Sequence, residues 1–221
     1  MLTYAIGDIH GRHDLLQRLL GKIREHAEGR PHRLVFLGDY IDRGPDSAAV
    51  IATVRALQGG SPDRVICLMG NHEDMLLKAI GDPTGTFWWV RNGGDAALAS
   101  FGVRSPAAIP GDLLEWIGSL PTSFEDEKHY YVHAGLRPGR PFERQSDEDR
   151  LWIREPFLEV NYDFGKHVVH GHTPLVTDRP DIRRYRTNLD TGAVFRGVLT
   201  AGVFTAEQGP PIGHLSASSQ L

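Results

Sequence analysis

LTYAIGDIHG, residues 2–11, joins a largely apolar run of five residues to a cluster of polar side chains directly behind it. The apolar half is typical of a buried strand, and Gly7 ends it ahead of Asp8 and His10. A helical pattern of leucines follows and stops at Gly29. The sequence therefore predicts a strand, a polar loop and a helix, in that order.

The same order occurs twice more along the chain. Residues 34–37 (LVFL) and residues 65–69 (VICLM) are apolar, and one glycine separates them from Asp39 and Asn71 respectively. Helical patterns follow both. Three such units predict parallel strands joined by right-handed helical crossovers. Each polar cluster then falls at the carboxyl end of a strand, where ligands bind in open α/β sheets.

The second half of the chain is richer in strands than the first. Residues 130–132 lead into His133, and residues 168–169 lead towards His172. This half predicts a second sheet that packs on the first, which makes the fold class α/β. The segment between the two halves has a helical pattern, and its Trp88-Trp89 pair indicates a core or lid contribution rather than a platform for a nucleotide base.

The composition is that of a globular chain, with 221 residues, 40% of them hydrophobic, and a net charge of −4. This charge lacks the basic character of a dedicated nucleic-acid binder. No stretch approaches the ~18 apolar residues of a membrane span, and the N-terminus lacks a signal-peptide pattern. We therefore expect a cytoplasmic protein without nucleic-acid or membrane partners. Residues 1–207 are expected to form a single domain and residues 208–221 a loosely ordered tail.

Five short polar clusters follow the expected strands. Taken singly, each has an ordinary explanation, since an aspartate behind a strand often caps a helix and a lone histidine often belongs to the core. Together they share one placement and are flanked by glycine, which permits close approach of the backbone. The clusters are residues 7–11 (GDIHG), 38–44 (GDYIDRG), 70–73 (GNHE), 133–135 (HAG) and 171–173 (GHT).

The clusters contain a set of metal-ligating side chains, namely two aspartates, three histidines and one asparagine. Carboxylate and amide oxygens mixed with imidazole suit Mn, Fe or Zn better than Mg alone. Six ligands are more than one open catalytic ion needs, and they suit two ions that share a carboxylate. The six candidates are Asp8, His10, Asp39, Asn71, His133 and His172.

In this order and spacing, the clusters resemble the signature of the calcineurin-like metallophosphoesterases. Within them they resemble the compact bacterial and phage members of the phosphoprotein phosphatase (PPP) family of serine/threonine phosphatases. The resemblance runs from Asp8 to His172. It implies a metallophosphoesterase-type β-sandwich of two mixed sheets flanked by helices, in α/β/β/α layers, with residues 1–207 as the catalytic domain. It also implies two divalent metal ions, with Mn preferred and Fe or Zn as alternatives.

The resemblance also implies how the six ligands are shared. One ion would be held by Asp8, His10 and Asp39. The other would be held by Asp39, Asn71, His133 and His172. Asp39 would therefore bridge the two ions.

Five residues acquire catalytic or substrate-binding roles through the same resemblance. His72 would be the general acid at the leaving oxygen, and Asp42 would orient its imidazole. Arg43 and Asn71 would contact the substrate phosphate. Arg154 stands where similar enzymes place a second phosphate-binding arginine, and a surface salt bridge is the alternative for it.

The implied reaction is hydrolysis of phosphoserine or phosphothreonine in proteins by direct attack of a metal-bridging hydroxide, with phosphotyrosine as a further candidate. The partner would be a phosphoprotein or phosphopeptide. The alternative is a symmetrical dinucleoside polyphosphate (diadenosine tetraphosphate) hydrolase. Those hydrolases commonly carry alanine before the Arg-Gly of the second cluster and aspartate after Asn-His, whereas Asp42 and Glu73 follow the protein-phosphatase pattern. A non-catalytic metal-dependent scaffold would lack ligands or His72, and this chain retains them.

Overall fold

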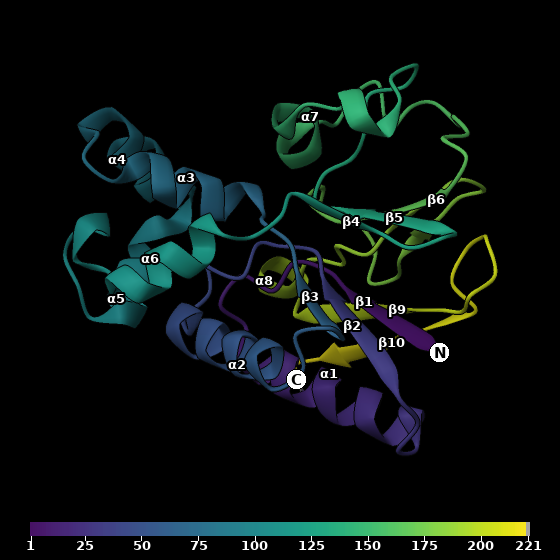
Figure 1. Ribbon diagram of the computed structural model, residues 1–221. Coiled ribbons are helices and arrows are strands. Elements are labelled where there is room, and N and C mark those ends of the chain that lie inside the picture. The colour runs from purple at the N-terminus through teal and green to yellow at the C-terminus, as the bar shows by residue number, and fades with distance from the viewer. Residues whose placement is uncertain (220–221) are drawn as a thin grey trace.

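Two five-stranded sheets pack face to face in the computed structural model, which describes residues 1–219 (Figure 1). The first sheet has the strand order β10 (Gly213–Ser218), β9 (Val198–Phe204), β1 (Leu2–Ile6), β2 (His32–Phe36) and β3 (Val65–Cys67). The second sheet has the order β4 (Ser123–Glu125), β5 (His129–Val132), β6 (His167–His170), β8 (Arg186–Asn188) and β7 (Asp181–Ile182). Both sheets are mixed, as the motif resemblance implied.

Each sheet contains a run of three parallel strands. In the first sheet β1, β2 and β3 run parallel, and β9 and β10 complete it in antiparallel fashion. In the second sheet β5, β6 and β8 run parallel between the antiparallel edge strands β4 and β7. The parallel pairing of β1 with β2 and of β2 with β3 confirms the parallel strands predicted from the first seventy residues.

Successive residues of the first sheet serve two different cores, because side chains alternate across a strand. On β1, Tyr4 and Ile6 pack with the helices, while Ala5 faces the second sheet. The core between the sheets consists of Ala5, Val35, Leu37, Leu68, Tyr131, Val169, Leu189 and Phe204. Burial of each large apolar side chain contributes about 1.5–3 kcal/mol, so this interface fixes the two sheets against each other.

The outer face of the first sheet is covered by α1 (His13–Ala27) and α2 (Ser47–Gly60). The apolar stripe of α1, which includes Leu15, Leu19 and Ile23, is buried against the sheet. On the outer side of the second sheet lie the 3₁₀ turn η3 (Phe142–Arg144) and α7 (Asp147–Trp152), while the short α8 (Ala193–Arg196) precedes β9. None of the helices in residues 1–219 is both long and apolar enough to cross a membrane.

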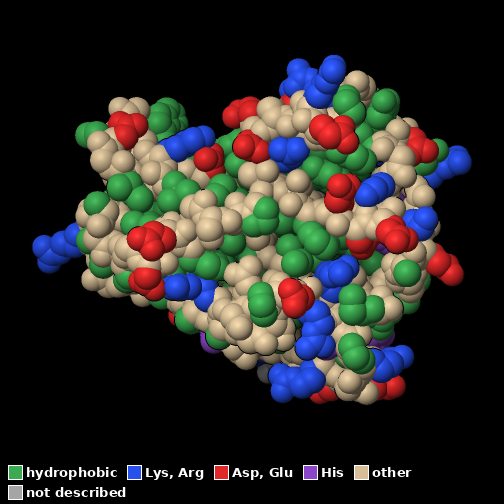
Figure 2. Space-filling model, viewed as in Figure 1, with side chains coloured by type: hydrophobic (Ala, Val, Ile, Leu, Met, Phe, Trp, Pro, Cys, Tyr) green, Lys and Arg blue, Asp and Glu red, His purple; other side chains and the backbone are tan. Residues whose placement is uncertain are grey.

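The middle of the chain forms a helical lobe beside the sandwich (Figure 1). Its elements are α3 (Asn71–Ala79), α4 (Pro83–Trp89), the π-helical turn η1 (Val90–Gly94), α5 (Asp95–Phe101), the 3₁₀ turn η2 (Pro106–Ala108) and α6 (Gly111–Gly118). The tryptophan pair divides, with Trp89 in the core and Trp88 exposed. Figure 2 shows a notch between this lobe and the side of the molecule that carries α7.

The C-terminal segment is built into the first sheet, which corrects the expectation of a loosely ordered tail over residues 208–221. Strand β10 pairs with β9 along its whole length. Lys22 and Arg18 of α1 donate hydrogen bonds to the backbone carbonyls of Ser216 and Ser218. The last two residues of the expected tail, 220–221, lie outside the described residues.

The serine-rich composition of this segment concealed an alternating pattern. Leu215 and Ala217 pack against the apolar core beneath α1, whereas the side chain of Ser218 is exposed. Small side chains suffice here because the neighbouring helix already supplies most of the apolar surface. The edge strand therefore gains its stability from backbone pairing and from one narrow apolar face.

Ala217→Asp tests this correction. Because Ala217 is only 1% exposed, the substitution would bury a carboxylate without a partner and should lower the free energy of unfolding by roughly 3 kcal/mol or more. Chemical denaturation followed by circular dichroism measures the loss. Ser218→Asp, at the exposed neighbouring position, is the matched control and should change stability little. Equal tolerance of both substitutions would show that the tail is not held in the sheet.

Candidate metal centre

The six side chains expected to bind metal lie together at the carboxyl ends of the parallel strands. The first sheet provides four of them from the loops behind β1, β2 and β3, and the second sheet provides two from the loops behind β5 and β6. All are buried, with exposed fractions of 7% or less: Asp8, His10, Asp39, Asn71, His133 and His172. The packing of the two sheets therefore assembles one polar cluster from both halves of the chain.

Asp39 lies at the centre of this cluster. Its Oδ2 is 3.3 Å from Nε2 of His10, and its Oδ1 is 3.5 Å from Nε2 of His133. A carboxylate oxygen of Asp8 lies within 4.8 Å of ligand atoms of both Asp39 and His133. Since the two oxygens of Asp39 face different histidines, this side chain has the arrangement expected of a carboxylate shared by two ions.

Asn71, His133 and His172 meet on one side of Asp39. Oδ1 of Asn71 is 2.9 Å from both Nε2 of His133 and Nδ1 of His172. Nδ1 of His133 donates to the carbonyl of Leu37 at 2.9 Å, so the neutral ring presents the lone pair of Nε2 to the asparagine oxygen. Two acceptors this close repel each other unless a positive charge lies beside them, and a divalent cation supplies that charge.

On the other side of Asp39, a backbone carbonyl also fixes the ring of His10. Its Nδ1 donates to the carbonyl of Ile41 at 2.9 Å, which leaves Nε2 unprotonated. This nitrogen is 3.3 Å from Oδ2 of Asp39 and accepts a hydrogen bond from Nη1 of Arg43 at 2.6 Å. A backbone carbonyl commonly fixes the tautomer of a metal-ligating histidine in this manner. In addition, Nε2 of His172 has no hydrogen-bond partner among the described residues.

Burial shifts the titration of the cluster towards uncharged groups. It lowers the pKa of His10 to about 3 and that of His133 to about 4, so both rings keep a free lone pair at neutral pH. It raises the pKa of Asp39 to about 7 and that of Asp8 well above its ordinary value. These carboxylates share a dry site in which the charge of Arg43 offsets the effect of burial only in part. The donor set and its electrostatics therefore fit two divalent cations.

The backbone of the site is strained. In residues 1–219, six non-glycine residues have positive φ, and five of these belong to the clusters, each at an energetic cost of about 1–3 kcal/mol. The five are His10 (45°), Asp39 (52°), Asp42 (73°), Arg43 (66°) and His172 (67°). Gly38 has a φ of 100° and abuts the backbone of Gly70, where any side chain would collide. Strain and close approach explain why glycines flank these clusters.

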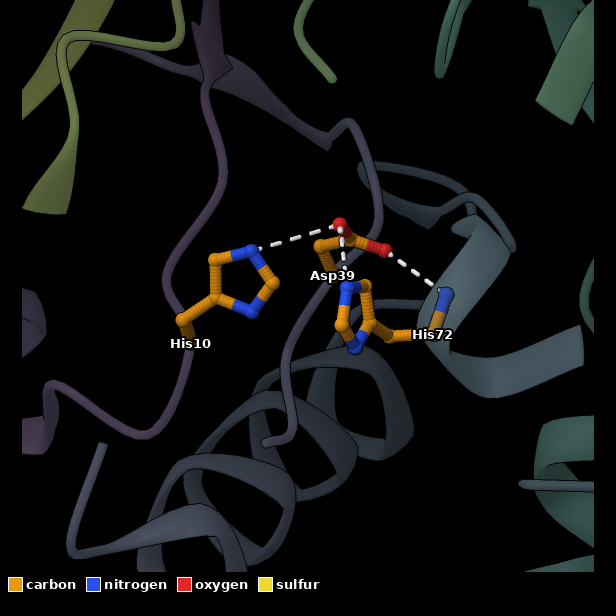
Figure 3. Close-up of side chains that lie close together, drawn as sticks. All are labelled: His10, Asp39 and His72. Atoms are coloured by element: carbon orange, nitrogen blue, oxygen red, sulfur yellow. Dashed lines mark hydrogen bonds and ion pairs between the residues drawn. The ribbon is translucent and has the colours of Figure 1, made fainter. Parts of the chain in front are cut away.

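His72 and Asp42 form a buried pair beside the candidate ligands. Nδ1 of His72 is 2.6 Å from Oδ2 of Asp42, which directs the opposite nitrogen, Nε2, towards the cluster, 4.0 Å from Oδ2 of Asp39. Figure 3 shows this ring beside Asp39 and His10. The three side chains also satisfy the spacing of a metal site. Because Asp42 engages Nδ1, His72 presents a single nitrogen to whatever occupies the centre.

The two arginines expected to bind phosphate differ in placement. Arg43 lies in the site, where its Nη1 is 2.6 Å from Nε2 of His10 and its guanidinium is 5.3 Å from the ring centroid of Phe195. Arg154 is exposed at the edge of the site. Its charge contributes, after burial, to the lowered pKa of His172. Arg43 is therefore close enough to act on an anion at the centre, whereas Arg154 lies at its edge, near His172.

Glu73 is a site residue whose role the sequence did not reveal, because a glutamate in this position also suits an ordinary helix start. It is fully buried, and its Oε2 accepts backbone N–H groups from Asp39 at 2.8 Å and Gly70 at 3.0 Å. Its Oε1 accepts from Tyr40 at 2.9 Å and Ile41 at 3.3 Å. Glu73 thus fastens the loop behind β2 to the start of α3.

Asp190 is a second residue whose role the sequence does not reveal, because Asp-Thr-Gly also suits an ordinary turn. It is buried beside Asp8. The negative charge of Asp190 contributes to the raised pKa of Asp8, and the two carboxyl groups share a hydrogen bond. Burial raises the pKa of Asp190 to about 7. The signal that could have revealed it is its position, since it follows β8 just as the other clusters follow their strands.

The model of the calcineurin-like phosphoesterase family matches residues 1–197. The chain belongs to this family. It is therefore a metallophosphoesterase and a hydrolase, and its ordered Asp, His and Asn clusters are those on which the family resemblance was based.

Relatives of this phosphoesterase have different activities in their names. The chain is 33% identical to "Serine/threonine-protein phosphatase 1" of Salmonella typhimurium, over 90% of this chain and 89% of that protein. It is 29% identical to the asymmetrical bis(5'-nucleosyl)-tetraphosphatase PrpE of Halalkalibacterium halodurans, over 89% and 87%. A Saccharomyces cerevisiae protein serine/threonine phosphatase superposes with a TM-score of 0.66 at 15% identity, covering 100% of this chain and 81% of that one, which shows the fold alone.

Glu73→Gln should destabilise the phosphoesterase by about 1–3 kcal/mol, because an amide NH₂ would replace one acceptor oxygen in front of backbone donors. Thermal or urea unfolding in the presence of a chelator measures the loss without a contribution from bound metal. Asp74→Asn, which removes the carboxylate of a surface pair with Lys78, is the matched control and should cost less than 1 kcal/mol. Equal losses in both variants would show that Glu73 does not fasten the loop.

Proposed function

We propose that this phosphoesterase is a serine/threonine protein phosphatase. It hydrolyses phosphoserine and phosphothreonine in proteins, and it accepts phosphotyrosine as a further substrate. The observation that carries the proposal is the buried pair of His72 and Asp42, 2.6 Å apart, with the free nitrogen of the imidazole directed towards the candidate metal centre.

The pair matters because leaving groups differ in their need for a proton. The alkoxide of serine or threonine is strongly basic, so its departure requires an acid at the ester oxygen. A nucleotide leaves as a phosphate anion of low basicity and gains much less from such an acid. An oriented histidine therefore serves a phosphomonoesterase of alkyl esters better than a hydrolase of dinucleoside polyphosphates.

The residues around the centre suit a phosphate dianion. The guanidiniums of Arg43 and Arg154 would bind its oxygens, with the amide of Asn71 at its side. Two divalent cations, held by the six ligands and with Mn²⁺ as the first expectation, would supply water of lowered pKa and screen the charge on the phosphate.

His72 would hold and deliver the proton. Burial lowers the pKa of its imidazole in the free protein, so the ring is neutral there, with Nδ1–H donated to Asp42 and a lone pair on Nε2. A phosphate monoester titrates near pH 6, so a bound monoanion can pass its proton to Nε2. The adjacent negative charge then stabilises the imidazolium, which returns the proton to the departing alkoxide.

The relatives support two activities. The serine/threonine phosphatase of Salmonella typhimurium matches nearly the whole chain, and its printed activity agrees with the proposal. The tetraphosphatase of Halalkalibacterium halodurans matches a similar share, which keeps dinucleoside tetraphosphate hydrolysis as the second candidate. Asp42 favours the first over the symmetrical tetraphosphatases, whose sequence pattern commonly has alanine in that place.

A substrate panel tests the proposal. Purified protein with Mn²⁺ is assayed for kcat/KM against phosphoserine, phosphothreonine and phosphotyrosine peptides and against diadenosine tetraphosphate. We expect the phosphoserine and phosphothreonine peptides to exceed the dinucleotide by at least tenfold. A preference for diadenosine tetraphosphate would contradict the proposal and establish the second candidate.

His72→Asn should lower kcat on a phosphoserine peptide by about 10²–10⁴-fold, because the general acid is lost. The loss on p-nitrophenyl phosphate should be smaller, since its leaving group is a weak base. Steady-state kinetics on both substrates measures the difference. His167→Asn, which alters a buried histidine at the other end of β6, is the control for packing. An identical loss on both substrates would remove His72 from proton transfer.

A further inference from the structure

Trp89 connects the helical lobe to the buried histidine–aspartate pair. It is the last residue of α4, and its side chain is completely buried. Its Nε1–H donates to Oδ2 of Asp42 at 2.8 Å, which is the same oxygen that is 2.6 Å from Nδ1 of His72. One carboxylate oxygen thus receives both ring N–H groups.

We propose that Trp89 is a positioning residue for the general acid: its indole N–H fixes the carboxylate of Asp42, which in turn sets the direction of Nε2 of His72. This inference rests on the proposed function, in which His72 protonates the leaving oxygen. Trp89 touches neither the substrate nor the candidate metal ligands in this role. It acts through Asp42.

Asp42 depends on this bond because, apart from Trp89, only His72 donates a hydrogen bond to its carboxylate among the described residues. Its second oxygen, Oδ1, has no hydrogen-bond partner among the described residues. Its backbone is in the left-handed region, with a φ of 73°. A carboxylate held only by His72 could rotate together with the imidazole. An indole is a suitable second anchor, since its N–H can only donate and its large ring moves little in a packed core.

The π-helical turn η1 holds the indole in place. Gly94 lies directly under the ring of Trp89, so that any side chain at this position would collide with it. The carbonyl of Gly93 accepts the backbone N–H of Arg43 at 3.0 Å. The segment from Trp89 to Gly94 therefore contacts both Asp42 and Arg43, the two adjacent strained residues of the second cluster. Gly93 has a φ of 104°, so a kink joins α4 to α5 at this point.

Trp89→Phe tests the role, because it keeps an aromatic ring and removes the N–H. We expect kcat on a phosphoserine peptide to fall about tenfold, the order expected for one lost hydrogen bond to a charged group. KM and metal content should stay unchanged, and turnover of p-nitrophenyl phosphate should fall less than threefold. The ratio of the two activities does not depend on the fraction of folded enzyme, so partial destabilisation cannot produce this result.

Trp116→Phe is the matched control. It removes an indole N–H bond of the same length, which runs 2.8 Å to Oε1 of Gln58 instead of to Asp42. Neither substrate should respond. In an Asp42→Asn background, Trp89→Phe should cause no additional loss, because the residue through which it acts is already altered.

Three kinetic results would overturn the inference: an unchanged ratio in Trp89→Phe, a full additional loss in the Asp42→Asn background, or the same ratio change in Trp116→Phe. If Trp89→Phe does not fold, the indole proton resonances decide instead. The chain has four tryptophans, and one of their signals should shift and lose exchange protection in Asp42→Ala, which removes the acceptor. Four unchanged signals would contradict the bond. A wild-type protein that hydrolyses no phosphomonoester would refute the proposed function rather than this positioning role.

Discussion

Negative charge buried among neutral histidines is the constraint on which the rest of the structure depends. Asp8 and Asp39 lie in a dry cluster, and burial raises the pKa of both carboxyls. His10 and His133 are held as neutral rings by backbone carbonyls and present unprotonated nitrogens to the same space. Such a cluster is costly without a cation and favourable with one. Binding of a cation would therefore relieve the electrostatic cost of burying these carboxylates, and this relief favours metal binding.

Interactions in the surrounding structure offset the free energy needed to hold these groups in place. Five residues of the clusters have positive φ, and the strain is offset by the apolar interface between the two sheets and by the four backbone hydrogen bonds of Glu73. Rigid strands carry the short loops, so each functional side chain has little freedom to move. The helical lobe extends this support to Asp42 and Arg43 through Trp89 and Gly93.

The sequence predicts the strands β1, β2, β3, β5 and β6 and the meeting of six candidate ligands behind them, because apolar runs and the placement of polar residues behind strands are local signals. It does not reveal Glu73, Asp190 or Trp89, since their partners lie far away in the chain and their local patterns suit a helix start, a turn and a core residue equally well. Strand β10 was missed for a related reason, because its small side chains gain their apolar surroundings from α1. Long-range packing, rather than local propensity, determines these four features.

The most direct measurement of the central claim is the number of divalent ions bound per chain. Native mass spectrometry of protein first stripped with a chelator and then supplied with Mn²⁺ gives this number without reference to any substrate. The account predicts two ions per chain in the wild-type protein and the loss of both in Asp39→Asn, because that carboxylate faces both halves of the site. A protein that binds no ion, or an Asp39→Asn variant that still binds two, would contradict it.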